Sequence, residues 1–532
     1  MTEQDLRAEF LSTLLTTPHR DLTAVQAYHE RMIAHDPRFY VHLAAWYADE
    51  GQVRDHKEMF VIMLTLSDFE GHRDVGLALL RRFPPYQVAR VVDYIKGQTI
   101  THRRKVEPSS RPPRQPSRGV AGRLRALVDR REQPEPLEAS DEEAEYIVET
   151  RTVGLSRNVP RSMKTEIERY LREREADDSW LDRAVLTARN PLKRLYAGLH
   201  IRPSARAQAI LFDDNPPTDS LAYKLKQIAN AETPAEQARA IVKYKIPYRV
   251  ASSVVHDMTP MVLAALIDVM TPQEVINNIG SLKRRGAMDN PEVKALIDDK
   301  LKAAKKDKRV SAYKAKVAAE AAGASDELAE SLSEVTEAKV KSTGSITRST
   351  ALLIDKSGSM NVAIEVGRQL GALISAICDA DLYAYAFDTV AYEIEPEGTS
   401  LADWERALAG INAGGGTSCG VALDWLRRQE RWVEQIVMVT DEGENTAPQF
   451  VTAYEEYASA LGVRPAVILV RVGRAVDLLQ RACRELGIAP NVFTFTGDYY
   501  ALPNVIPFLT YPSLTEMVMD VLNYPLPERM PG

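Results

Sequence analysis

The sequence predicts an α-helical repeat module followed by an α/β domain of Rossmann-like type. Up to about residue 316, apolar residues recur at spacings of three and four, which is typical of amphipathic helices. From residue 346, short apolar runs rich in β-branched and aromatic residues alternate with helical stretches, which indicates a parallel sheet covered by helices. A chain of 532 residues is also too long for a single core, so at least two domains are expected.

The helical module is predicted to span residues 1–345, with a last helix and a linker at 317–345. Its amphipathic segments are short and separated by Pro, Gly, Asp or Ser. Three of them open with Thr-Pro, at Thr233, Thr259 and Thr271, which suits an N-cap residue followed by proline at the first helical position. Many such helices in series predict a scaffold of stacked helix pairs, and the periodicity leaves open whether the stack is open or closed.

Residues 101–149 interrupt the helical pattern and are expected to form a largely flexible, charge-segregated insertion. Residues 101–131 hold ten Lys or Arg and two acids, whereas residues 132–149 hold eight acids and no Lys or Arg. The two blocks either pair with each other in a solvated linker, or the basic block reaches a nucleic acid.

The α/β domain is predicted to span residues 346–510, with residues 511–532 as a C-terminal tail. Strands are expected at 349–355, 381–388, 434–441, 465–473 and 491–497, and helices at 362–378, 419–431, 446–461 and 475–487. This alternation predicts a parallel sheet with helices on both faces.

The stretch STALLIDKSGSM, residues 349–360, ends a predicted strand with an acid and does not match the common catalytic motifs. An aspartyl phosphotransferase usually has a second Asp two residues after the first, where this chain has Ser357. A serine hydrolase needs a G-x-S-x-G elbow and a base, usually His, but the last histidine of the chain is His256. A phosphate-binding G-x-x-x-x-G-K-[ST] loop is absent from the sequence. We therefore expect that the protein is not an enzyme.

A metal site explains the same residues better. Ser357 and Ser359 follow Asp355 at alternate positions, Thr417 lies on a glycine-rich stretch, and Asp441 ends a later predicted strand. Hard oxygen ligands with few full charges suit a divalent cation, above all Mg²⁺. The site would lie at the C-terminal edge of the sheet, where such sheets bind their ligands. The alternative is that these residues only cap a helix and close turns.

These five residues, in this order, resemble the metal-ion-dependent adhesion site (MIDAS) of von Willebrand factor A domains. The chain departs from the family's frequent pattern at Ser418, because an acid often follows the threonine. Glu442 and Glu444 are expected to add negative charge that favours a cation.

The helical module and this domain together resemble the Ro family of RNA-binding proteins, over roughly residues 30–510 except 101–149. The resemblance lies in the stretches DPRFYVHLAAWYADEGQVRDHKEMF, RSMKTEIERYLRE, YAGLHIRPS and VLAALIDVMTPQEVINNIGSL. It implies a ring of HEAT-like helical repeats, the TROVE module, closed by the A domain.

The same resemblance implies a function in ribonucleoproteins. Small structured Y RNAs would bind a basic outer surface, and single-stranded 3′ ends of other non-coding RNAs would enter the hole of the ring. Bacterial relatives work with exoribonucleases in RNA quality control, processing and decay, notably under stress, and are not enzymes themselves. The positions that match the RNA-facing residues of the family are Arg161, Lys164, Lys193, His200 and Arg202, and the neighbouring Arg189 and Arg194 match less well. The alternative is an ordinary solvated helix face, with His200 in the core.

Charge and composition limit the partners. A formal net charge of −7 gives no overall attraction to nucleic acid, so an RNA site must be a local patch and no DNA partner is expected. The polar N-terminus and the lack of an apolar window of about eighteen residues predict a cytoplasmic protein without a membrane partner. The three cysteines have no spacing typical of a disulfide framework or a zinc site. The main rival function is a metal-dependent protein-binding scaffold without an RNA role.

Overall fold

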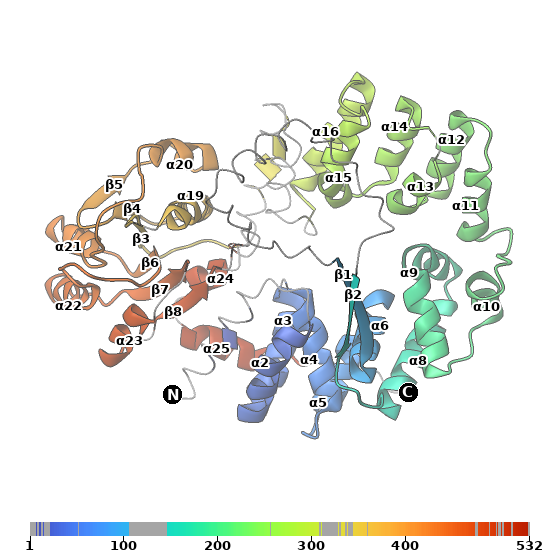
Figure 1. The fold of residues 1–532 in the computed structure, drawn as a ribbon, viewed down its shortest axis with the longest axis horizontal. Helices are drawn as coiled ribbons and strands as arrows, with labels where there is room; N and C mark the ends of the chain where they lie inside the picture. Colours follow the sequence, from blue (N-terminus) through green and yellow to red (C-terminus); the bar gives the residue numbers. More distant parts are fainter. Residues whose placement is uncertain are drawn as a thin grey trace, which may run out of the picture. The chain divides into compact units, whose positions relative to one another are not determined.

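The computed structural model describes residues 22–105 and 146–310 except positions 52, 256, 308 and 309 (Figure 1). It also describes residues 344–529 except 359, 474–476, 489, 496, 498–501, 503, 504, 512 and 513. Before residue 22 and between 311 and 343 it describes isolated positions, so most of the helix and linker expected at 317–345 lies outside the described residues. The contacts divide the chain into two units, residues 92–159 and the remainder.

The continuously described part begins with five helices, of which α2, α3 and α4 share an aromatic core. In α3 the Asp36 carboxylate accepts a hydrogen bond from the Phe39 N–H at 2.9 Å, and Pro37 takes the first helical position. Tyr40 and Tyr47 are fully buried in the core. The helices are α2 (Leu22–His35), α3 (Pro37–Glu50), α4 (Arg54–Leu66), α5 (His72–Arg81) and α6 (Pro85–Lys96).

Two buried histidines lie within this aromatic core. His29 on α2 shares hydrogen bonds with the Tyr40 hydroxyl, 2.8 Å from its Nδ1, and with Nδ1 of His56, 2.9 Å from its Nε2. Burial, and to a lesser degree the neighbouring His56, holds the pKa of His29 well below its ordinary value. His29 is therefore neutral in the folded protein at neutral pH.

We expect His29 to make the fold less stable in acid. Below about pH 6.5 the unfolded chain protonates this residue and the folded protein does not, so the free energy of unfolding falls by up to about 1.4 kcal/mol per pH unit. Urea unfolding between about pH 7 and pH 5 measures this slope. The His29→Gln variant should have a shallower slope, and the control His35→Gln, at an exposed position of the same helix, should keep it. Equal slopes in the two variants would contradict the assignment.

Nine helices between residues 161 and 304 continue the module as stacked repeats. Alternate helices pack on one another, α12 on α14, α14 on α16 and α11 on α13, which is how stacked repeats bury a continuous core. The predicted helical-repeat architecture is confirmed. The helices are α8 (Arg161–Glu175), α9 (Asp178–Leu199), α10 (Ala205–Leu211), α11 (Leu221–Ala229), α12 (Pro234–Tyr244), α13 (Tyr248–Val254), α14 (Pro260–Val269), α15 (Pro272–Arg284) and α16 (Pro291–Ala304).

The three Thr-Pro pairs begin helices as predicted. Thr233, Thr259 and Thr271 are the N-caps of α12, α14 and α15, and each hydroxyl accepts a hydrogen bond from the N–H three residues on. At α15 the Glu274 carboxylate also accepts the Thr271 N–H at 2.9 Å, which completes a capping box. Among the helices of the described residues, none is long and apolar enough to cross a membrane.

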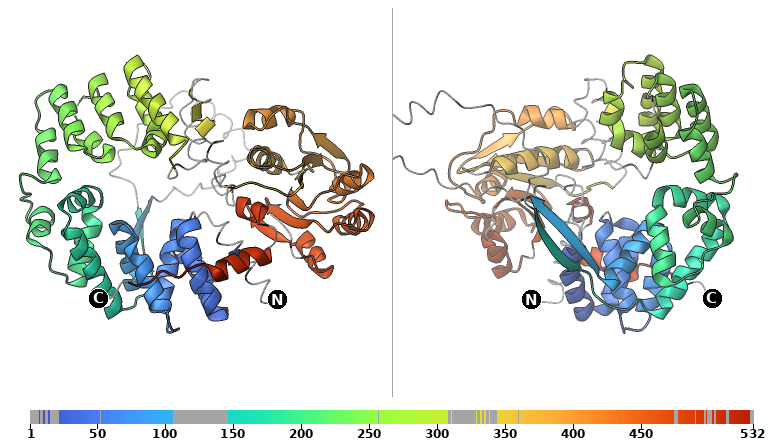
Figure 2. Two further views of the ribbon diagram at one scale, coloured as in Figure 1. Left: turned by 180° about the vertical axis from the view of Figure 1, so that it is seen from behind. Right: turned by 45° about the vertical axis from the view of Figure 1, so that its right-hand side comes forward.

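The second unit, residues 92–159, contains a two-stranded antiparallel ribbon of β1 (Gln98–Lys105) and β2 (Tyr146–Val153) (Figure 2). The expectation of a flexible segment over 101–149 is therefore wrong at its two ends, which pair as strands. Both ends contain β-branched residues, as in TIT and YIVETRTV, and the register sets His102 opposite Glu149. Residues 106–145 lie outside the described residues.

The α/β domain holds a six-stranded sheet in the order β5-β4-β3-β6-β7-β8. Neighbouring strands are parallel except β4 and β5, which form an antiparallel pair. The five predicted strands are confirmed, but the sheet is mixed rather than parallel, because the short edge strand β5 was not predicted. The strands are β3 (Thr350–Asp355), β4 (Leu382–Phe387), β5 (Ala391–Ile394), β6 (Gln435–Thr440), β7 (Ala466–Arg471) and β8 (Asn491–Thr494).

Helices cover both faces of the sheet, as predicted. In the central strand β3, Leu352 and Ile354 face the core under α19 and α20, and Leu353 faces the core under α21, α22 and α23. Gly371 lets α19 lie against the Trp404 ring, because a Cβ there would be 2.2 Å from that ring. The helices are α19 (Asn361–Ser375), α20 (Leu401–Ala407), which was not predicted, α21 (Val421–Arg428), α22 (Phe450–Leu461) and α23 (Leu478–Glu485).

The C-terminal segment carries α24 (Ile506–Thr510) and α25 (Leu514–Asn523) and returns to the first helices of the chain. Helix α25 packs on α3. After it, the Tyr524 hydroxyl donates to the Asp49 carboxylate at 2.9 Å, and the Arg529 guanidinium donates to Glu166 at 2.8 Å. The predicted tail is therefore held by side chains of the helical module.

Candidate metal and RNA sites

Three loops meet at the C-terminal edge of the sheet, where β3 and β6 end. The Gly414 N–H donates to the Lys356 carbonyl at 2.7 Å, which joins the glycine-rich loop to the loop after β3. The Thr417 carbonyl accepts from the N–H groups of Asn445 and Thr446 at 3.0 and 2.9 Å, which joins it to the loop after β6. Four of the five predicted ligands lie on these loops or at the strand ends beside them, namely Asp355, Ser357, Thr417 and Asp441. The fifth, Ser359, lies outside the described residues.

Asp355 is a fully buried carboxylate at the end of β3. Its Oδ1 accepts the Ser357 N–H at 2.9 Å, and its Oδ2 accepts the Thr440 hydroxyl at 2.8 Å. Burial raises the pKa of Asp355, hydrogen bonds from Ser357 and Thr440 oppose this, and the charge of Asp441 adds to it. No Lys, Arg or His of the described residues forms an ion pair with Asp355. A bound cation would compensate this buried charge.

Of the other three described ligands, Ser357 hydrogen-bonds Asp355 through its side chain, whereas Thr417 and Asp441 each keep one side-chain oxygen without a hydrogen bond to another described residue. Thr417 is 5% exposed, and its N–H donates to the Asn445 side-chain oxygen at 2.9 Å. Its hydroxyl has no hydrogen bond to any other described residue. Asp441 is half-buried, and its Oδ1 accepts the Gly443 N–H at 2.9 Å, while its Oδ2 is unused by the described residues.

The two glutamates that follow Asp441 do not both favour a cation, contrary to the expectation. Glu442 is fully buried and pairs with Arg471 at 2.5 Å, so its charge is compensated. The Glu444 carboxylate accepts the N–H groups of Cys419 and Phe450 at 3.1 and 2.7 Å, which places it at the start of α22. Its negative charge therefore stabilises a helix end.

Lys356, between the first two predicted ligands, is a charged residue that the sequence analysis missed. It is 9% exposed, its Nζ pairs with the Asp388 carboxylate, and it lies 4.7 Å from the centre of the Tyr392 ring. The Lys356 charge is thus compensated by Asp388 rather than by Asp355, so the Asp355 carboxylate stays without an ion pair. A signal was present in the sequence, because Lys356 stands within the motif and Asp388 ends the next predicted strand.

The donor set fits a small, hard divalent cation. It offers carboxylate and hydroxyl oxygens, and the described residues hold no group of three or more His, Cys, Asp or Glu that could bind a metal. Two carboxylates with hydroxyl groups suit Mg²⁺, because this ion keeps several waters and needs few protein ligands. The residues that could hold it are therefore those that the motif predicted.

The first two predicted RNA-facing residues lie at the start of α8. Arg161 is exposed at the first helical position, and Lys164 is half-exposed one turn later. Neither forms a hydrogen bond or ion pair with another described residue through its side chain. The start of α8 thus presents two uncompensated cations.

The next three predicted RNA-facing residues, Arg189, Lys193 and Arg194, lie on the second half of α9, beyond a kink in that helix. Arg189 pairs with Asp214 at 3.6 Å, and Lys193 Nζ lies 5.7 Å from the centre of the Phe212 ring. Arg194 is exposed beside them. An acid therefore compensates Arg189, whereas Lys193 contacts an aromatic ring.

The last two predicted RNA-facing residues, His200 and Arg202, lie at the turn after α9. His200 caps the helix with a φ of 55° and is exposed, so the alternative that it is a core residue is wrong. Arg202 is exposed, and its carbonyl accepts the Arg172 guanidinium of α8 at 2.5 Å. Arg172 lies eleven residues after Arg161, about 16 Å along the helix. Arg202 therefore lies near the C-terminal end of α8, whereas Arg161 and Lys164 lie at its start.

The fold and the converging loops define a class of protein, in which a helical-repeat module is joined to an α/β domain like that of von Willebrand factor A. No protein-family model and no curated protein sequence matches the chain. Among solved structures, the Ro (RSR) protein of Deinococcus radiodurans has the same fold, with a TM-score of 0.60 over 95% of this chain and 99% of that chain. The two sequences are 14% identical, so the likeness establishes the fold. The resemblance to the Ro family is confirmed at that level.

Proposed function

We propose that this chain is an RNA-binding protein of the Ro type. It holds a small structured RNA, of the Y RNA kind, on exposed cations of the helical module, and a single-stranded 3′ end of another non-coding RNA in the hole of a ring. The likeness of fold to the Ro protein over 95% of the chain carries the proposal. The uncompensated cations at the start of α8 support it, because Lys and Arg bind phosphates without reading sequence.

In this role the chain supplies binding rather than catalysis. It presents defective or unprocessed RNA to an exoribonuclease in the cytoplasm, and so serves RNA quality control, processing or decay under stress. A labelled RNA incubated with the protein and Mg²⁺ is expected to stay intact. Cleavage by the purified chain would contradict this part of the proposal.

Charge reversal on the helical module tests RNA binding. The double variant Arg161→Glu, Lys193→Glu should weaken binding to all RNA sequences alike and should reduce the salt slope of the affinity by about two units, one for each lost phosphate contact. Fluorescence anisotropy across a salt series measures this, with a structured RNA that has or lacks a single-stranded 3′ tail. The tail is expected to raise the affinity.

A control for net charge is the double variant Arg406→Glu, Arg464→Glu, which makes the same charge change on exposed positions of the α/β domain. It should bind RNA like the wild type. Unchanged binding in the helical-module variant would show that the surface assignment is wrong, and no binding by the wild type at low salt would refute the RNA function.

We also propose that the three loops of the α/β domain bind Mg²⁺. Asp355, Ser357, Ser359, Thr417 and Asp441 would hold the ion. Bound there, the cation supplies a positive charge that can accept a carboxylate from a partner protein. The buried, uncompensated carboxylate of Asp355 is the observation that supports this site.

A second candidate function rests on the same loops: a protein-binding scaffold that uses the metal and has no RNA role. The convergence of the glycine-rich loop with the ends of β3 and β6 favours it. The two functions differ in a simple observation. An RNA-binding chain is expected to copurify with nucleic acid that RNase removes, whereas the scaffold would purify without it.

A further inference from the structure

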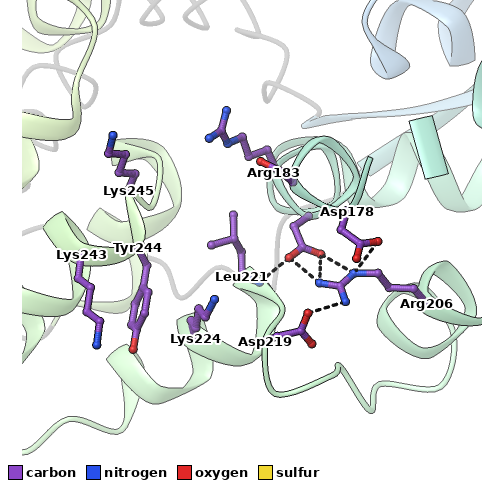
Figure 3. Close-up of a pocket in the computed structure, with 11 residues that line it drawn as sticks. Asp178, Arg183, Arg206, Asp219, Leu221, Lys224, Lys243, Tyr244 and Lys245 are labelled. Atoms are coloured by element: carbon purple, nitrogen blue, oxygen red, sulfur yellow. Dashed lines mark hydrogen bonds and ion pairs between the residues drawn. The ribbon is translucent and has the colours of Figure 1, made fainter. Parts of the chain in front are cut away.

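A pocket of about 360 Å³ lies among α9, α11 and α12 of the helical module, apart from the seven residues proposed to face RNA (Figure 3). Five cations and three acids line it, together with the Tyr244 ring and the Leu221 side chain. Its charged groups divide into a wall where three acids compensate one cation and leave a net negative charge, here called the compensated wall, and four cations outside it.

The acids belong to the compensated wall. Asp178, Asp182 and Asp219 all converge on the Arg206 guanidinium, at 3.5, 3.0 and 2.9 Å (Figure 3). Asp182 also accepts the Leu221 N–H at 2.9 Å, which ties the wall to the start of α11. This network fixes the wall before any ligand arrives.

The other four cations form no ion pair with an acid of the described residues, although the charge of Lys224 acts on the nearby Asp219 carboxylate. The side chains of Arg183, Lys224, Lys243 and Lys245 form no hydrogen bond or ion pair with another described residue. Lys224 and Lys243 lie on the two sides of the Tyr244 ring, with their Nζ atoms 5.1 and 5.3 Å from its centre (Figure 3). Two cations, one from α11 and one from α12, thus flank the Tyr244 ring.

Lys245 adds a conformational observation. It ends α12 with a φ of 49°, in the left-handed region where helix ends usually carry glycine. A lysine at this position costs stability relative to glycine, and its side chain gains no partner among the described residues. A ligand contact would account for a charged side chain there.

We propose that this pocket binds a small ligand that carries two or more linked phosphates. Because Lys224, Lys243 and Lys245 line the pocket as separate ammonium groups, an anion with two or more linked phosphates could contact more of them than a single phosphate. The exposed carboxylates of Asp178 and Asp219 would repel a continuous RNA backbone that passes the wall, but a compact anion can stay on the lysine side. The site is separate from the proposed RNA surface and does not depend on it.

Calorimetric titration of the full chain with inorganic pyrophosphate, in EDTA to exclude metal binding, tests the pocket. The wild type should bind one pyrophosphate per chain more tightly than orthophosphate. The double variant Lys224→Gln, Lys243→Gln should lose about tenfold in affinity for each lysine. The control Lys226→Gln changes a lysine of the same helix that pairs with Asp214 outside the pocket, and should bind like the wild type.

Lys245→Gly separates binding from folding. It should weaken pyrophosphate binding while the midpoint of thermal unfolding stays the same or rises, because glycine fits the left-handed conformation. Absence of saturable pyrophosphate binding by the wild type would overturn the proposal, and so would an equal loss in Lys226→Gln. If the Lys224→Gln, Lys243→Gln variant lost RNA affinity and kept pyrophosphate affinity, these lysines would belong to the RNA surface instead.

Discussion

Replacement of Asp355 by alanine is expected to abolish Mg²⁺ binding, while the affinity for RNA hardly changes. Asp355 is the buried carboxylate of the candidate site, and its hydrogen bonds come from Ser357 and Thr440 rather than from a basic group. Loss of a direct carboxylate ligand should cost more than the roughly 10- to 100-fold that loss of a supporting group costs. Calorimetry on protein stripped with EDTA measures this effect.

Stability provides a second readout for the same variant. Mg²⁺ should raise the midpoint of thermal unfolding of the wild type, because a ligand of the folded state stabilises it by mass action, and should not raise that of Asp355→Ala. In EDTA the variant should be about as stable as the wild type, since the replaced carboxylate is buried without a basic partner. Asp379→Ala, at an exposed acid before β4 and away from the three loops, is the control and should keep Mg²⁺ binding. A normal metal signal in Asp355→Ala would remove this residue from the ligand set.

Replacement of Glu166 by alanine is expected to loosen the C-terminal segment and to lower the free energy of unfolding by about 1.5–3 kcal/mol, the cost of losing hydrogen bonds to a buried charged group. Glu166 is fully buried, and its two oxygens receive the guanidinium groups of Arg81 at 3.1 Å and Arg529 at 2.8 Å. Without it, the two arginines lose their shared acid, and each keeps one other acid, Glu173 for Arg81 and Asp74 for Arg529. Urea unfolding measures the stability, and hydrogen exchange over residues 514–529 reports loosening of the segment.

Two further variants test the role of Arg529 in this contact, one at Arg529 itself and one at a control ion pair. Arg529→Ala should increase exchange in the C-terminal segment with a smaller loss of stability, because Arg81 still compensates Glu166. Arg464→Ala breaks an exposed pair with Glu455 and should cost about 1 kcal/mol or less. If Arg529→Ala left exchange over residues 514–529 unchanged, the ion pair would not hold the segment.

Elements with local signals were predictable from the sequence. Thr271 and Glu274 lie three residues apart, and their capping box needs nothing outside α15, so the start of that helix could be predicted. The strands β3, β6 and β7 contain the uninterrupted apolar runs ALLI, IVMV and AVILV, as expected for strands covered on both faces. The edge strand β5 escaped prediction, because its four residues include the exposed Tyr392 and Glu393 and become a strand only by pairing with β4.

The candidate metal site also has a part that the sequence predicts and a part that depends on the tertiary structure. Asp355, Ser357, Thr417 and Asp441 follow from short motifs and from the rule that parallel strands end at one edge of a sheet. The pairs that set their surroundings join residues distant in sequence: Asp355 with Thr440, Lys356 with Asp388 and Glu442 with Arg471. No local pattern shows which acid meets which base, so the compensation of Glu442 could not be predicted.

The sequence by itself determined the two kinds of domain, the helix starts and the chemical type of the candidate metal site. These depend on periodicity, capping and motif spacing, which act over a few residues. The tertiary structure alone decided which charges stay uncompensated: Asp355, the cations around Tyr244 and those at the start of α8. It also decided that Glu166 pairs with Arg529 of the C-terminal segment. Ion pairing depends on distances in the folded chain, and 363 residues separate Glu166 from Arg529 in the sequence. No local sequence pattern could therefore predict this pair.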